Sequence, residues 1–94
     1  MIKKREFILV EGAFTPQDAR EILTNLYNSK INFHMLKDFS STERFGVHDE
    51  TASKRIPELK NSIVAISEIV QDAAVKNKNL VIAATVNIQV EPDK

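Results

Sequence analysis

The stretch over residues 49–77 constrains the fold more than any other part of the chain. Its apolar residues alternate steps of four and three, the heptad spacing that keeps one stripe of a helix against a partner helix. The members of this stripe are Ala52, Ile56, Leu59, Ile63, Ile66, Val70 and Ala73. The spacing predicts a long helix over 49–77 that packs on a second helix.

The second half of this predicted helix is apolar on further sides. Val64, Ile69 and Val75 lie off the stripe, and a helix that is apolar on most sides must be covered on most sides. We therefore expect the part after Ile63 to be sandwiched between another helix and either a sheet or a second subunit. Pro57 cannot donate a backbone hydrogen bond, so we expect either a kink there or a helix that begins near it.

A second helix is predicted to begin after Thr15, because a capping hydroxyl followed by Pro16 and Asp18 is typical of a helix start. Two apolar rows follow. The row predicted to face the 49–77 helix consists of Ala19, Ile22, Leu26, Phe33 and Leu36. A row at every fourth residue winds away from it and consists of Leu23, Tyr27, Ile31, Met35 and Phe39. This helix therefore either packs against two different neighbours or breaks near residues 28–30 and changes direction.

Strands are predicted on both sides of the helices. Residues 3–13 contain a short β-prone run, and residues 80–90 alternate apolar and polar side chains as a half-buried strand does. Residues 39–50 are predicted to form a loop of roughly ten residues between the helices. The predicted fold is a single α+β domain over residues 1–94 with the order strand, helix, helix, strand: a long antiparallel helical hairpin with flanking antiparallel strands.

A second copy is expected to complete this fold. A sheet of two strands alone is marginal in water, and two helices with wide apolar faces cannot cover one another. We therefore predict a homodimer in which the helices form a four-helix bundle, with the strands of both subunits shielding it or pairing into a larger sheet.

The composition limits the classes of partner. Lys plus Arg and Asp plus Glu both number 13, so no net charge attracts nucleic acid or an anionic membrane. The basic residues Lys3, Lys4 and Arg5 have no aromatic residues interleaved with them, which argues against nucleic-acid binding. The chain has no Cys and no apolar run long enough for a signal peptide or a membrane span. We expect a soluble cytoplasmic protein without membrane contact.

Two polar clusters are candidate catalytic or metal sites. Ser40, Ser41 and Thr42 lack the glycine-framed turn that exposes a nucleophile, and we interpret them as caps and turn residues rather than catalytic groups. His34 and Asp38 are one helical turn apart and would share a metal ion with His48 and Asp49 if the tip of the hairpin folds back, whereas such a pair more often forms a surface hydrogen bond. We predict no catalytic residue, no metal and no cofactor.

Two candidate binding sites remain. Arg44, Phe45 and Val47 lie in the predicted loop. The apolar pair is expected to tuck between the helices, and otherwise forms a partner-binding surface with Arg44. Tyr27 and His34 form a candidate ligand site at the dimer interface, where these residues and Arg44 would converge from the two chains.

Several segments resemble a group of short uncharacterised bacterial proteins of about this length: residues 11–16, 30–34, 39–46 and 55–59. The resemblance implies a bacterial origin and a small soluble protein. It implies no activity and transfers no site residue.

The sequence therefore favours a non-enzymatic, dimeric protein-interaction or regulatory module. The alternatives are a ligand-binding protein or enzyme with its site at the dimer interface, and a nucleic-acid-associated regulator.

Overall fold

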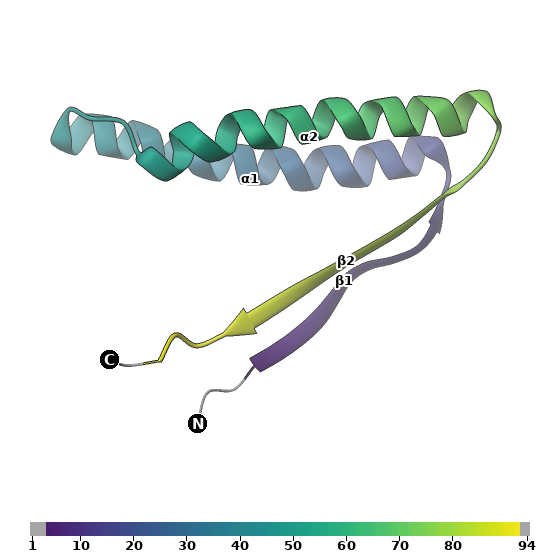
Figure 1. The fold of residues 1–94 in the computed structure, drawn as a ribbon, viewed down its shortest axis with the longest axis horizontal. Coiled ribbons are helices and arrows are strands. Elements are labelled where there is room, and N and C mark those ends of the chain that lie inside the picture. The colour runs from purple at the N-terminus through teal and green to yellow at the C-terminus, as the bar shows by residue number, and fades with distance from the viewer. Residues whose placement is uncertain (1–3, 93–94) are drawn as a thin grey trace.

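The computed structural model of the protein describes residues 4–92 (Figure 1). The elements in chain order are β1 (Lys4–Phe14), α1 (Pro16–Phe45), α2 (Glu50–Val75) and β2 (Leu80–Gln89). The predicted order of strand, helix, helix and strand is confirmed. Residue 3, the predicted first residue of the first strand, lies outside the described residues.

The helix α2 presents the predicted stripe to α1. Ala52, Leu59 and Val70 are buried, and the other members of the stripe are half-buried. The helix begins at Glu50, with the Asp49 side chain capping it by accepting from the Ala52 N–H at 2.9 Å. The prediction that the helix begins near Pro57 is therefore wrong, because α2 includes Pro57 in its interior.

The helix α1 is longer than predicted. It begins as expected, with the Asp18 N–H donating to Thr15 Oγ1 at 3.2 Å, but it runs without a break to Phe45. The predicted ten-residue loop is thus reduced to residues 46–49. The Thr42 hydroxyl bonds the carbonyl of Asp38 at 3.0 Å and stays within the helix. Gly46 then ends the helix in the left-handed conformation, at φ 71°.

The buried side of α1 changes character along its length. Up to Ile31 both predicted rows are buried or half-buried. Beyond Ile31 the inward positions belong to His34, which is buried, and Asp38, which is half-buried. Five large apolar residues of this part are each more than half exposed: Phe33, Met35, Leu36, Phe39 and Phe45. The prediction that Phe33 and Leu36 face the second helix is therefore wrong.

The strands form a two-stranded antiparallel ribbon. Its register pairs Phe14 with Leu80 at one end and Lys4 with Gln89 at the other, with an irregularity between Ile8 and Val10 that leaves Leu9 as a bulge. Paired residues share a face of a sheet. One face is therefore mostly apolar, and we call it the apolar ribbon face: Phe7, Val10, Phe14, Leu80, Ile82, Ala84, Val86 and Ile88.

The core lies at the end of the molecule where the ribbon joins the helices, which we call the apex. Ala19, Val70 and Ile82 are buried there, and five half-buried residues pack on them: Val10, Phe14, Leu23, Ile66 and Leu80. From the apex the ribbon runs away from the hairpin at an angle (Figure 1). The molecule is consequently thin, with extents of 50 × 38 × 14 Å.

This shape leaves much of α2 uncovered within one chain. Val64, Ile69 and Val75 are each more than half exposed. The chain's own ribbon therefore covers the C-terminal half of this helix only around Val70, and not at Val64, Ile69 and Val75.

Candidate interaction surfaces

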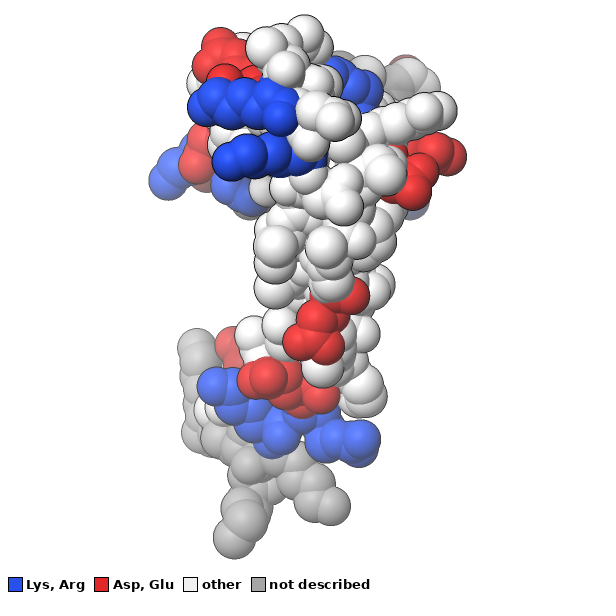
Figure 2. Space-filling view, turned by 90° about the vertical axis from the view of Figure 1, so that its right-hand side faces the viewer, with Lys and Arg blue, Asp and Glu red and all other residues white. Residues whose placement is uncertain are grey.

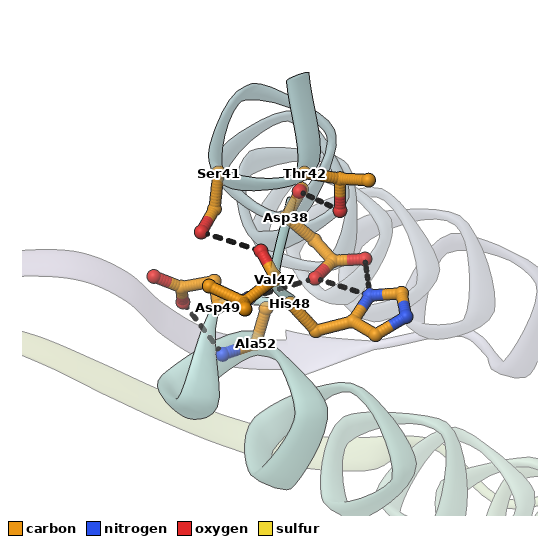
Figure 3. Close-up of polar contacts among 7 residues, drawn as sticks. All are labelled: Asp38, Ser41, Thr42, Val47, His48, Asp49 and Ala52. Atoms are coloured by element: carbon orange, nitrogen blue, oxygen red, sulfur yellow. Dashed lines mark hydrogen bonds and ion pairs between the residues drawn. The ribbon is translucent and has the colours of Figure 1, made fainter. Parts of the chain in front are cut away.

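Polar contacts hold the hairpin closed at its tip, the end opposite the apex (Figure 3). One carboxylate oxygen of Asp38 accepts from the Asp49 N–H at 2.9 Å, and the two oxygens lie 3.0 and 3.1 Å from Nδ1 of His48. The Ser41 hydroxyl donates to the carbonyl of Val47 at 2.8 Å. These bonds fix the short loop against the last turns of α1.

The Asp38 carboxylate is a structural group in this arrangement. The Asp49 N–H lowers the pKa of Asp38, and contacts with His48 lower it further, while partial desolvation opposes both. The carboxylate is committed to these two donors. Within residues 4–92 no three His, Cys, Asp or Glu side chains are grouped so as to hold a metal ion. Of the two histidines, it is His48 and not His34 that contacts Asp38.

The predicted partner-binding residues project from the tip. Phe45 is 73% exposed and Val47 is 60% exposed, and Arg44 is also exposed. The expectation that the apolar pair tucks between the helices is wrong. The bond from Asp49 to Asp38 starts α2 beside Asp38, so the last two turns of α1 extend past the start of α2 and have no helix beside them (Figure 1).

The candidate ligand residues do not converge within one chain. Tyr27 is half-buried, and His34 is 5% exposed with no hydrogen-bond partner for its Nε2 atom. The two residues are seven positions apart on one straight element, which corresponds to about 10 Å along the helix axis. Arg44 lies ten positions further on, at the exposed tip.

The largest feature that the sequence did not place correctly is an apolar surface on α1. We call Phe33, Met35, Leu36 and Phe39 the α1 patch. The ammonium of Lys30 lies 4.8 Å from the centre of the Phe33 ring, a contact that covers one ring face. The sequence signal for this arrangement was the pair of polar residues on the buried side, His34 and Asp38. Polar residues on a helix normally mark its solvent side, so the pattern led to the opposite prediction.

A second uncovered surface is the far half of the apolar ribbon face. Exposure along β2 rises from 9% at Ile82 to 37% at Val86 and 52% at Ile88. On β1 the guanidinium of Arg5 lies 5.1 Å from the centre of the Phe7 ring. The prediction of a half-buried second strand therefore holds near the apex and fails toward its end, because the ribbon leaves the helices.

A shallow groove of about 720 Å³ follows α2 on the side of Arg20. Its lining combines the apolar residues Ile63, Val64 and Val75 with polar residues, among them Ser67 and Glu68. The groove is open to solvent along its length, so it offers a helix or strand a surface to pack on rather than an enclosed site for a small molecule.

No protein-family model, no curated protein and no solved structure matches this chain. Neither of the two described helices is long and apolar enough to cross a membrane.

Proposed function

We propose that this chain is a homodimeric protein-interaction module that carries out no catalysis. The observation that supports this proposal most strongly is the exposure of the α1 patch. Its four large apolar side chains are each more than half exposed on one helix, and contiguous exposed apolar side chains commonly mark a protein–protein contact site. Burying them against another protein would remove this surface from water, which is the main source of affinity in most protein complexes.

A homodimer is proposed because a single chain leaves much of its apolar surface exposed. A ribbon of two strands supplies too little coverage for two long helices, and exposed apolar residues occur on all four elements. A second copy carries the same exposed apolar surfaces. In a dimer with a two-fold axis, a surface of one copy packs against the same surface of the other.

The tip is the proposed site for a different protein. Arg44 and Phe45 belong to residue types that contribute strongly to binding energy at interfaces. They sit on helical turns that project beyond α2 and are held there by the Asp38 and Ser41 bonds. Such a projecting, pre-ordered surface loses little conformational entropy on binding.

Sedimentation equilibrium of the wild type tests the dimer. We expect a folded dimer that persists at micromolar concentration. A folded monomer at every concentration would contradict the proposal.

Affinity capture tests the tip. The double variant Arg44→Ala, Phe45→Ala is expected to lose the captured protein while remaining dimeric. Glu43→Ala, an exposed change on the same helical turn, is the matched control and should retain it. Equal capture by both variants would exclude the tip as the contact surface.

A ligand site at the dimer interface is the second candidate function, and the unpaired Nε2 of His34 favours it. It requires the dimer to bring Tyr27 and His34 of one copy near Arg44 of the other around an enclosed cavity. A crystal structure of the dimer without such a cavity would exclude it.

A further inference from the structure

The two edges of the ribbon differ in their chemistry. The strand β1 carries four charged residues, Lys4, Arg5, Glu6 and Glu11, and it is interrupted by the bulge at Leu9. The strand β2 has the sequence LVIAATVNIQ, with no charge, no Gly, no Pro and no bulge. Charges and bulges are the features that keep an edge strand from pairing with another chain. The edge of β1 has this protection, and the edge of β2 lacks it.

The edge of β2 is also unpaired. In the described part of the chain, β2 bonds to β1 on one side and no strand lies on the other. Figure 2 shows an uncharged surface on the part of the strands just below the helices, with charged residues over the helices above it and acidic and basic residues farther along the strands below it. The backbone N–H and C=O groups of every second residue along this ten-residue strand point to the free edge and are therefore available to a further strand.

We propose that two copies of this chain join by antiparallel pairing of β2 with β2, which produces one four-stranded sheet in the order β1-β2-β2-β1. This inference rests on the homodimer of the proposed function and identifies its interface.

The burial gradient along β2 supports a second copy as the occupant. Ile82 is buried at the apex, whereas Ile88 is exposed at the free end. Antiparallel pairing of identical strands places the free end of one beside the apex end of the other. The exposed residues of each ribbon then lie next to the region where the helices of the other copy cover the sheet.

The sheet geometry places both hairpins correctly for this coverage. A two-fold axis that relates two antiparallel edges of one sheet is perpendicular to that sheet, so both copies present the same face on the same side. The apolar ribbon faces therefore combine into one surface, and the four helices lie over it from opposite ends.

The alternation of side chains restricts the register. Residues opposite one another share a face, so pairing must join even-numbered residues to even-numbered ones, and a slip of one residue would place apolar residues beside the polar face. A register centred on Thr85 places Ala84 opposite Val86 and Ile82 opposite Ile88 of the second copy. The small Ala84 side chain then meets the larger Val86, whereas centring on Ala84 would place two alanines together.

Cysteine cross-linking tests this interface directly, because the chain has no native Cys. Thr85→Cys is expected to give a disulfide-linked dimer for most of the protein under mild oxidation, since residues directly opposite in a sheet have Cβ atoms about 5 Å apart. Glu6→Cys and Glu11→Cys are matched controls on the same face of the ribbon but at the other edge. They should remain unlinked.

A charge at the edge gives an independent test. Thr85→Lys places two ammonium groups opposite one another and is expected to weaken dimerisation on the order of fivefold. Ile8→Lys is its control, because Ile8 is paired with Thr85 across the ribbon and exposed on the same face. Dimerisation of this control should change less than twofold, within about 0.4 kcal/mol.

The outcomes separate this inference from the proposed function. A wild type that is monomeric at all concentrations contradicts both. A dimeric wild type in which Thr85→Cys fails to link and Thr85→Lys associates normally overturns only the β2 interface. Linking of the Glu6→Cys and Glu11→Cys variants as readily as Thr85→Cys also overturns it.

Discussion

The apex and the tip of this molecule are built from the same two helices but are stabilised in different ways. At the apex, side chains from both helices and both strands meet around Val70, which is 1% exposed. At the tip, hydrogen bonds of Asp38 and Ser41 hold the loop, and the apolar residues face solvent. The chain therefore covers its own apolar surface at one end only, and it leaves the remaining surface available to other molecules.

The difference follows from the direction of the ribbon. Since β1 and β2 leave the helices at an angle (Figure 1), they add a second layer only near their junction with the helices. Farther along, the hairpin has one layer and the ribbon has one layer, and neither has a covering partner within the chain.

The largest expected effect compares two valines of α2. Val70→Ala should lower the free energy of unfolding by about 2 kcal/mol, because it removes two buried methyl groups and leaves a cavity. Val64→Ala, the same change at an exposed position of the same helix, should cost less than about 0.5 kcal/mol in the separated monomer. Urea denaturation measures both, and equal losses would show that Val64 is covered in solution.

A smaller effect is expected at the buried histidine. His34→Leu should raise the free energy of unfolding by about 1 kcal/mol, because Leu has a similar volume and leaves no unpaired nitrogen between the helices. His48→Leu, at an exposed position bonded to Asp38, should give no such gain. A loss of stability in His34→Leu would show that His34 has a bonding partner in solution.

The turn at the tip offers a comparable test of backbone conformation. Gly46→Ala should cost about 1 kcal/mol, because the residue has φ 71° and no neighbouring atoms restrict an added methyl group. Asn77, near the end of α2, also has a positive φ of 55°. Asn77→Gly should be neutral or slightly stabilising, and thermal unfolding would compare the two. A neutral Gly46→Ala would mean that the tip does not need this conformation.

The lowered pKa of Asp38 defines the direction in which the stability of the fold changes with pH. The pKa of Asp38 is lowered from its ordinary value of 3.8 in the folded chain. The carboxylate therefore stabilises the fold fully above that ordinary pKa, and the contribution is lost as the pH falls through the lowered value. The difference in unfolding free energy between wild type and Asp38→Asn should be largest near neutral pH and disappear in acid.

One further variant tests which contact contributes most to the lowered pKa of Asp38. Because the Asp49 N–H is the largest contribution, His48→Gln should keep most of the pH dependence. Loss of the whole dependence in His48→Gln would show that the His48 contact is dominant instead.

Much of the fold followed from local patterns. The heptad stripe of α2, the Thr15 cap and the alternation in β2 each specify an element through its own periodicity or end chemistry. The length of α1 did not follow from such a pattern. Ser40, Ser41 and Thr42 are typical of turns, but their hydroxyls can also bond within or across a helix end, and the contact of Asp38 with Asp49 decides between these possibilities.

The sequence by itself determined the order of the elements and the face that α2 presents, because both depend on the spacing of residues close together in the chain. Only the tertiary structure decided which side of α1 is buried beyond Ile31, where α2 begins beside α1, and that the ribbon leaves the hairpin. Two apolar rows on one helix satisfy the same periodicity, and the choice between them depends on the position and angle of distant elements. That choice placed Phe33, Met35, Leu36 and Phe39 on the outside.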